Sequence, residues 1–538
     1  MGNYYELCDF CLLILSSRFS NACNFSNEDT LDAVVIVIHS WILVYNPKFG
    51  HSHTNFMARI ADILAEAGHE VTSLMPVIDP SIHNCTTKSR IIPVERGKTA
   101  ASMFDEFTSI KSDLFSASYF DVVKSYRVRE FFGGVFPAQC RVLLDNERLM
   151  QELQAEKFDG MIVEHFDMCG VGLVELIKPT AFISVSTATV FGSLQQDEFG
   201  IPSALSYDPA MFISYFNVHS IWDRLWNLIA DWVFCLQLSF VRNEIDALFQ
   251  EKFGKDYPSV REIGSHSAYV FVNAEPLIDY AAPTISQVIY IAGIGAKEPK
   301  KLDVDWEAVL LKRPRSVLIS FGSMVKSIYL PDDVKMAFVD TFRSFPDVTF
   351  IWKYEAEDDF AKEVGAKVDN IVLSRSQEPA GFHHSRRNGI YPRNGNERRI
   401  FVPVFAEQPR NAGMMEHNGL GKVIDKHEMA NASKIIEVLR EVLENPSYYD
   451  NAQRTAAMLR SKPFSSREQL IKYTEFAAEF GPSAALRPQS FDMNWIEYNN
   501  ADIIAVGVLI IIIAATISVK IILSVVTGCS IAKQIKND

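Results

Sequence analysis

Two short clusters of residues have the chemistry of metal ligands. Cys8 and Cys11 form a Cys-x-x-Cys pair, and His383 and His384 are adjacent. A structural zinc site needs four ligands in tetrahedral geometry. No second cysteine pair or nearby histidine cluster completes the first, and nothing around the two histidines supports a metal or phosphate site. The sequence therefore predicts neither a metal site nor a cofactor.

The composition narrows the class of protein. The eight cysteines are dispersed, and their spacing does not decide how they pair. Asn-x-Ser/Thr triplets begin at Asn24, Asn84 and Asn431, as in a lumenal glycoprotein, although such triplets also occur by chance. A net charge of -14 does not indicate a basic surface that would bind the phosphate backbone of a nucleic acid, so we expect no nucleic-acid partner. A chain of 538 residues is long enough for two or three folding units.

The segment from Ile503 to Val526 has the composition of a transmembrane helix. It is almost wholly apolar, and Lys520 near one end is its only charge. As a helix it spans roughly 36 Å, enough for a hydrocarbon core of about 30 Å. Acidic residues precede it and lysines follow it, so the positive-inside rule places residues 527–538 in the cytosol and the body in a lumen. Residues 1–40 are an atypical leader, unless the true start lies elsewhere.

The first half of the chain alternates strands and helices. Residues 41–45 are typical of a strand, and they precede a helical pattern that Gly68 ends. A second strand begins at Glu70, and strand, helix, strand is the unit of a parallel sheet. Further buried strands are predicted over residues 158–163 and 181–185.

Residues 213–240 are aromatic-rich and helical in pattern. Such a segment suits a core helix or a patch on a membrane surface. We predict a core helix, because large apolar side chains are usually interior.

A second series of strands begins after a stretch containing Pro, Gly and Lys over residues 281–301, which we interpret as a linker. Strands are predicted over residues 316–320, 348–352, 370–373 and 400–405, alternating with helical segments. Both halves are therefore expected to be doubly wound α/β domains that face a cleft, with ligands at the carboxyl ends of the strands.

Four segments carry a specific resemblance to a known family. They are Ile42 to His53, Val270 to Gly295, Val317 to Met324, and Val402 to Ala412. Together with the C-terminal apolar helix, they closely resemble the UDP-glucuronosyltransferase family, particularly its nematode members. The likeness covers roughly residues 41–538.

The resemblance implies an α/β fold of the GT-B type with two Rossmann-like domains. It assigns residues 41–285 to acceptor binding and residues 286–490 to the UDP-sugar. It implies inverting transfer of a glucuronosyl or glucosyl group to a hydroxyl or acid group of a small lipophilic acceptor, with no metal. The chain would be a single-pass protein of the endoplasmic reticulum membrane, bound to lipid through its C-terminal helix and able to form homo- or hetero-oligomers.

His53 resembles the general base of the family, because it follows a strand and opens a helix. A hydroxyl acceptor must lose its proton during attack, and a neutral imidazole can accept that proton. The positive end of a helix disfavours the imidazolium. Glu164 stands where relatives place the carboxylate that orients this base, with Asp167 as the competing candidate and His51 as the competing histidine.

Five residues of the second half resemble the donor site. Gly322 would let the backbone approach the diphosphate, and Ser323 would donate a hydrogen bond to it. Glu407 and Gln408 resemble the pair that binds sugar hydroxyls, and Asn411 resembles the asparagine just beyond that pair.

Residues 374–399 depart from the family. Relatives carry a histidine and a helix start here that hold the diphosphate, whereas this interval has six arginines and no hydrophobic periodicity. If each codon of Phe382 to Arg393 is read from its second base, the genetic code permits Phe-Ile-Thr-His-Gly-Gly-Met-Gly-Ser-Thr-Gln-Glu, which fits the missing motif. We therefore interpret residues 374–399 as a frame-shifted reading, and the alternative function is a catalytically inactive, membrane-anchored family member.

Overall fold

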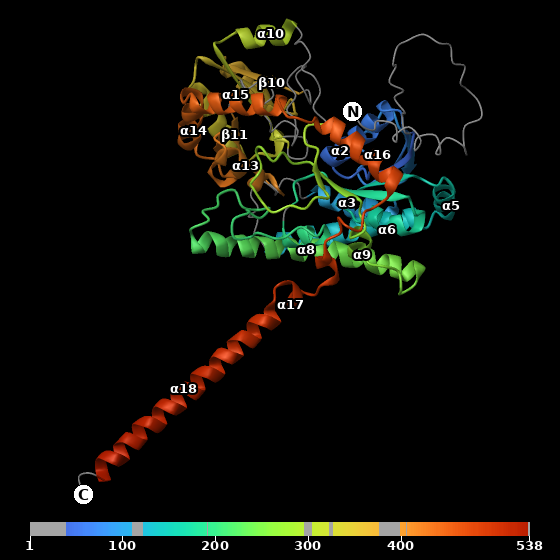
Figure 1. The fold of residues 1–538 in the computed structure, drawn as a ribbon. Helices are drawn as coiled ribbons and strands as arrows, with labels where there is room; N and C mark the ends of the chain where they lie inside the picture. Colours follow the sequence, from blue (N-terminus) through green and yellow to red (C-terminus); the bar gives the residue numbers. More distant parts are fainter. Residues whose placement is uncertain are drawn as a thin grey trace, which may run out of the picture. The chain divides into compact units, whose positions relative to one another are not determined.

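Residues 39–109, 122–190, 192–294, 304–321, 326–375, 399–404 and 406–535 are described by the structure, a computed structural model (Figure 1). Within them, parallel strands alternate with helices. The strands form a seven-stranded, a three-stranded and a two-stranded sheet. The α/β fold predicted from the sequence is confirmed.

The seven-stranded sheet has the order β3-β2-β1-β4-β5-β6-β7, and all its strand pairs are parallel. Its central strands are buried throughout, as expected when helices cover both faces of a parallel sheet. The sheet extends past the predicted start of the linker, because β7 lies within it. The strands are β1 (Trp41–Tyr45), β2 (Glu70–Pro76), β3 (Arg90–Val94), β4 (Gly160–Glu164), β5 (Ala181–Ser186), β6 (Tyr269–Val272) and β7 (Val288–Tyr290).

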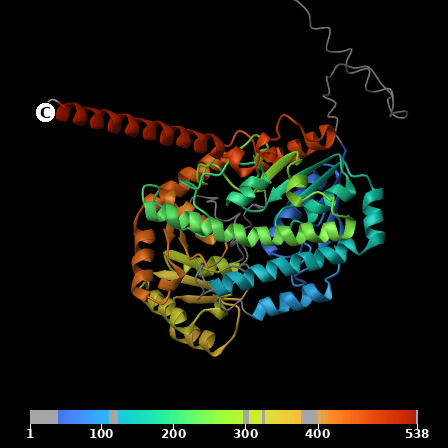
Figure 2. The same ribbon diagram turned by 90° about the horizontal axis from the view of Figure 1, so that it is seen from below.

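Helices α4 and α8 pack against each other along this domain (Figure 2). A disulfide between Cys140 and Cys169 joins the last turn of α4 to the start of α6, a pairing that the sequence alone did not decide. The helices are α2 (His51–Glu66), α3 (Lys98–Ser109), α4 (Val122–Leu144), α5 (Glu147–Ala155), α6 (Cys169–Ile177), α7 (Ser193–Glu198), α8 (Ile221–Phe253) and α9 (Val260–Gly264).

The prediction of a core helix over residues 213–240 is wrong for residues 213–220, which precede the helix, and for the exposed side chains between residues 221 and 236. The helix begins at Ile221, because the Ser220 side chain accepts a hydrogen bond from the Asp223 amide and caps it. Trp222 and Trp232 are 68% and 63% exposed. Periodicity identifies an apolar side of a helix, but it does not reveal whether anything covers that side.

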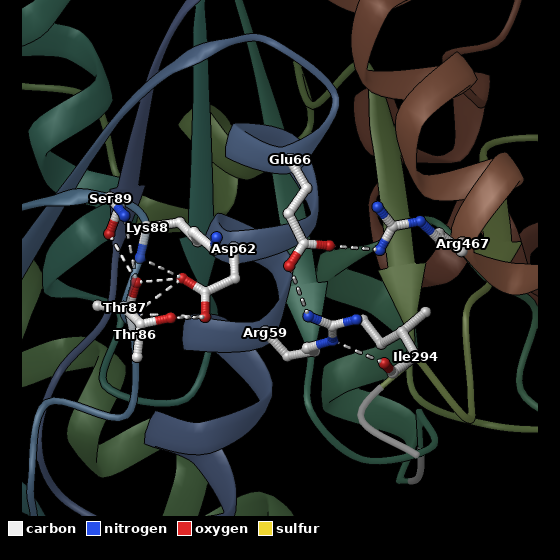
Figure 3. Close-up of polar contacts among 9 residues, drawn as sticks. All are labelled: Arg59, Asp62, Glu66, Thr86, Thr87, Lys88, Ser89, Ile294 and Arg467. Carbon is white, nitrogen blue, oxygen red and sulfur yellow. Dashed lines mark hydrogen bonds and ion pairs between the residues drawn. The ribbon is translucent and has the colours of Figure 1, made fainter. Parts of the chain in front are cut away.

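Two polar clusters hold helix α2 in the part that follows its first turn (Figure 3). The buried Asp62 carboxylate accepts hydrogen bonds from the Thr86 hydroxyl and from the Thr87 and Lys88 amides, which fastens the loop before β3. Glu66 pairs with Arg59 of the same helix and with Arg467 of α16 (Ser466–Phe480). These contacts hold the helix that begins with His51 in a single position.

The second domain has a sheet of order β10-β9-β8 and a separate pair, β11 and β12. Trp352, Phe350 and Phe342 are fully buried in its core. The strand predicted over residues 400–405 ends at Phe401, because Pro403 has no amide to donate to a ladder. The strands are β8 (Arg315–Ile319), β9 (Val348–Lys353), β10 (Ile371–Ser374), β11 (Arg399–Phe401) and β12 (Gly421–Val423).

The end of the chain returns to the first sheet before its last helices. Helix α16 packs against β4, β5 and β6, where Leu470 and Ala477 are buried. Within α18, Ala501–Val525 is long and apolar enough to cross a membrane. The remaining helices are α10 (Val304–Leu311), α11 (Asp332–Arg343), α12 (Asp359–Lys367), α13 (Gln408–His417), α14 (Ala432–Glu444), α15 (Ser447–Arg460), α17 (Trp495–Tyr498) and α18 (Ala501–Ile535).

Candidate active site

The strand order of the first sheet reverses at β1. The chain runs from β1 through β2 to β3 on one side and then crosses to β4 on the other. Tyr45 lies opposite Val163 in the register, and Glu164 lies opposite Val185. The carboxyl ends of β1, β4 and β5 therefore meet at one edge, which is where open α/β sheets bind ligands.

His53 lies in the first turn of α2, directly after β1. The Thr54 hydroxyl donates to the carbonyls of Gly50 and Pro47, and its amide also donates to Gly50. These bonds fix the start of the helix and hence the direction of the histidine. The His53 side chain is 23% exposed, so the imidazole is held in place and still reaches solvent.

Glu164 and Thr187 lie beside His53. The Thr187 hydroxyl is 2.6 Å from His53 Nδ1 and donates to Glu164 Oε1 at 3.2 Å, while Glu164 Oε2 lies 3.5 Å from the same ring nitrogen. A hydroxyl has one proton, so Thr187 accepts from Nδ1–H when it donates to Glu164. This network assigns the tautomer whose Nε2 is unprotonated and can accept a proton.

The competing carboxylate, Asp167, is engaged elsewhere. The Tyr45 hydroxyl donates to Asp167 Oδ2 at 2.7 Å. Burial raises the pKa of Asp167 to about 7, the nearby Glu164 charge adds to the rise, and the Tyr45 hydrogen bond opposes it. Of the two candidates from the sequence, Glu164 is therefore the one next to the histidine.

A cluster of phenylalanines borders the His53 ring. The Phe166 ring centroid lies 4.9 Å from that of His53, and Phe49 stacks on Phe166 at 5.9 Å. Phe132 and Phe136 contact both of these phenylalanines at centroid distances of 5.1–5.8 Å. A flat apolar molecule would find favourable contacts along such rings.

The candidate donor residues of the second domain fall into two groups. Glu407, Gln408 and Asn411 lie together at the start of α13, where Gln408 Oε1 accepts a hydrogen bond from the Val404 amide at 2.8 Å. The Asn411 amide donates to the Glu407 carbonyl. Gly322 and Ser323 lie outside the described residues, as do residues 376–398 of the aberrant interval.

Arg410, which sequence reasoning missed, connects α13 to the first domain. Its guanidinium is almost fully buried and pairs with Asp208 at 2.9 Å and with Asp279 at 2.8 Å. Close packing accompanies the ion pairs, since a Cβ on Gly413 would lie 2.0 Å from the Ser214 carbonyl oxygen. An arginine two residues after the Glu-Gln pair was the only sequence signal, and arginines are usually exposed.

The fold and this edge are those of a two-domain glycosyltransferase of the GT-B type. The family described as UDP-glucoronosyl and UDP-glucosyl transferase matches residues 41–536. The chain therefore belongs to this family.

Relatives and solved structures agree. A Caenorhabditis elegans protein, ugt-48, is 27% identical over 90% of this chain and 95% of its own length. Human UDP-glucuronosyltransferase 1A10 is 25% identical over 87% of this chain and 89% of its own. The kitacinnamycin glycotransferase matches 82% of this chain and 100% of its own at a TM-score of 0.54 and 13% identity, which shows the fold.

Proposed function

We propose that the protein transfers a hexosyl group, glucuronosyl or glucosyl, from a UDP-sugar to a hydroxyl or acid group of a small lipophilic acceptor, with inversion. The observation that carries this proposal is the placement of Glu164 and Thr187 against Nδ1 of His53 at the switch point of the first sheet. With Nδ1 engaged in this way, Nε2 is the ring nitrogen that would accept the proton of an acceptor, as a general base requires.

The proposed step is a single displacement. The acceptor oxygen attacks the anomeric carbon of the sugar. The bond between that carbon and the UDP oxygen breaks, and UDP leaves with the electron pair of the broken bond. The acceptor proton goes to Nε2 of His53. Glu164 then stabilises the imidazolium, and Thr187 keeps the ring in orientation. In the second domain, Glu407, Gln408 and Asn411 would bind sugar hydroxyls, and Gly322 and Ser323 would contact the diphosphate.

The phenylalanines beside His53 support a lipophilic acceptor. Phe166 and Phe49 present aromatic rings next to the proposed base. An acceptor with a flat apolar body would pack on them and place its hydroxyl at the imidazole. A related solved structure is that of a Phytolacca americana enzyme, UGT2, complexed with UDP-2fluoro-glucose and pterostilbene, at a TM-score of 0.50. Phenols are therefore the first acceptors to assay.

The proposal is tested with UDP-glucuronate, UDP-glucose and 4-nitrophenol. An enzyme should show saturable protection by one UDP-sugar against heat unfolding, and it should release UDP only when the phenol is present. Protection without turnover over a panel of phenols, alcohols and acids would contradict the acceptor assignment. A chain that neither UDP-sugar protects would not be a transferase as written.

A second candidate function is a catalytically inactive, membrane-anchored family member. The observation in its favour is the composition of residues 374–399, which replaces the expected histidine and helix start with arginines. The first domain keeps its own buried core, so an inactive chain would retain the acceptor side or associate with active relatives. Binding of 4-nitrophenol without any UDP-sugar binding would identify this case.

We further propose a single-pass location in the endoplasmic reticulum membrane, with the domains in the lumen and the C-terminus in the cytosol. The apolar length of Ala501–Val525 supports one span. The Cys140–Cys169 disulfide supports an oxidising compartment for the body. Protease added to sealed microsomes should remove only the tail after about residue 526. Digestion of the domains under these conditions would reverse the proposed topology.

A further inference from the structure

The first half of α8 presents apolar side chains to the outside. Ile221, Trp222 and Trp232 are each more than 60% exposed, and three leucines between and after them are 44–51% exposed. The helix lies beside α4 along the first domain (Figure 2). We define the α8 apolar face as Ile221, Trp222, Leu225, Leu228, Trp232 and Leu236.

The α8 apolar face is opposite to the side that the helix buries. From Ile221 to Leu236, its members recur every three or four residues, which places them on one side of a helix. Asn227, Ala230 and Val241 are buried and fall on the other side. The exposed apolar side chains are therefore an additional surface, separate from the packing that holds α8 in the domain.

The second half of the same helix provides an internal reference. On the side that continues the α8 apolar face, it carries Ser239, Asn243 and Gln250. This is the ordinary composition of a helix surface in water. The exposed side of α8 thus changes from apolar to polar along its length, as it would if the first half met a different medium.

The apolar span of α18 begins within reach of this helix. The Phe491 carbonyl accepts a hydrogen bond from Arg261 of α9, whose guanidinium also lies 5.6 Å from the Phe491 ring. Helix α9 contacts α8. Residue 501, where the apolar span begins, is ten residues further on, so it lies within about 36 Å of Phe491 even in a fully extended chain. Helix α8 itself is about 50 Å long.

Aromatic residues next to the span indicate the same medium. Trp495, Ile496 and Tyr498 of α17 are exposed a few residues before Ala501. Tryptophan and tyrosine concentrate at the membrane–water interface, because their rings are amphipathic. The six members of the α8 apolar face likewise carry no charge.

We propose that the α8 apolar face lies in the headgroup region of the bilayer that α18 enters, so that the first domain rests on the membrane along the first half of α8. The occupant is a lipid surface, and the inference rests on the anchor proposed above. Since the face is uncharged, binding should depend on buried apolar area and little on anionic lipid or salt.

The test uses the full chain in vesicles of phosphatidylcholine whose acyl chains are brominated near the headgroup, because bromine quenches nearby tryptophans. Trp222→Phe with Trp232→Phe should remove much of the bromine-dependent quenching of the parent. Trp306→Phe, on α10 of the second domain, should leave it unchanged. Equal quenching of the parent and the double variant would overturn the proposal.

A matched pair of charged variants separates a membrane from a second copy of the chain. Leu225→Glu with Leu228→Glu should reduce the quenching, while Asn243→Glu with Gln250→Glu, on the polar half, should not. Both pairs should unfold at nearly the parent temperature, because none of the altered side chains is buried. If the leucine variants instead keep full quenching and lower the mass of the particle in detergent, the face is an interface between copies and the proposal fails.

Extraction with alkaline carbonate tests the anchor independently. A chain that resists extraction but shows no quenching of Trp222 and Trp232 keeps its anchor and contradicts the α8 proposal alone. A chain that carbonate removes, yet whose two tryptophans are quenched on vesicles, contradicts the anchor and supports the face.

Discussion

The two domains differ in how their described strands are joined. In the first, β1, β4 and β5 are neighbours in one sheet, and their carboxyl ends bring His53, Glu164 and Thr187 together. In the second, β10 pairs with β9 and β11 pairs with β12, and the aberrant residues stand between β10 and β11. Each domain has its own buried core. The proposed acceptor side can therefore keep its arrangement of His53, Glu164 and Thr187 while the proposed donor side is altered.

The largest expected effect comes from repairing the donor side. Replacing Phe382 to Arg393 with Phe-Ile-Thr-His-Gly-Gly-Met-Gly-Ser-Thr-Gln-Glu should strengthen UDP-sugar binding, which we expect to be poor in the chain as written, because it restores a histidine and helix amides for the diphosphate. At a ligand concentration 100 times Kd, binding should stabilise the repaired chain by about 2.7 kcal/mol. The shift of the thermal midpoint with UDP-sugar measures it.

A chain with the same twelve residues in scrambled order is the control and should show no such shift. If the chain as written is protected as well as the repaired one, the interval is not the defect that we infer. Sequencing of the transcript across residues 365–405 provides an independent check. An unbroken frame that encodes the arginine-rich interval, with different bases in the shifted register, would refute the frame-shift interpretation.

The next largest effect concerns the acceptor side of an active, repaired chain. His53→Ala should lower kcat by about 10²- to 10⁴-fold, the usual contribution of a general base. UDP-sugar affinity should stay nearly unchanged, because the base acts on the acceptor proton. His51→Ala is the matched control. Retained turnover in the His53 variant, with loss in the His51 variant, would move the role to His51.

The sequence predicted β1, β2, β4 and β5 of the seven-stranded sheet, because buried parallel strands are continuous apolar runs between turn residues, but it did not predict β3, β6 or β7. It placed His53 and Glu164 just after the carboxyl ends of two strands. The carboxyl ends of neighbouring parallel strands lie at the same edge of a sheet, so the two residues could be expected to lie close together. Thr187 follows β5 in the same way, yet one threonine gives no signal until β4 and β5 are known to be adjacent. The ion-pair partners of Arg410 come from distant segments of the chain. Tertiary packing brings them together, and it leaves no pattern in the local sequence.

The junction between the two regions should be sensitive to the loss of one charge. Arg410→Met leaves the buried Asp208 carboxylate and the mostly buried Asp279 carboxylate without their cation, which should cost about 3–5 kcal/mol of stability. Adding Asp208→Asn and Asp279→Asn should recover a large part of this loss, because no unpaired charge remains. Urea unfolding measures both. If Arg410→Met has the stability of the parent, Arg410 does not join the domains.

Asp167 should make the stability of the first domain depend on pH. Burial raises its pKa from 3.8 to about 7, so the folded chain binds this proton more tightly than the unfolded chain. The contribution of this proton to the free energy of unfolding is fully present below pH 4 and is lost as the pH rises towards 7. At about 1.4 kcal/mol per pKa unit, the loss amounts to a few kcal/mol. The thermal midpoint of unfolding should therefore fall as the pH rises. Asp167→Asn should make this fall smaller, while Asp256→Asn, at an exposed position, should leave it unchanged. An unchanged slope would contradict the assignment.

The smallest effect tests whether Thr187 positions His53, the proposed base. Thr187→Val keeps the shape of the side chain but removes the hydroxyl that accepts from His53 Nδ1 and donates to Glu164. A neutral hydrogen bond is worth about 0.5–1.5 kcal/mol, so kcat in a repaired chain should fall by about tenfold at most. The KM for the UDP-sugar and the thermal midpoint should change little, because the substitution alters only the orientation of the His53 ring. Thr187→Ser should restore kcat, since it returns the hydroxyl without the methyl group. A matched change in the thermal midpoint and kcat, or a Ser variant as slow as the Val variant, would mean that Thr187 only packs against His53.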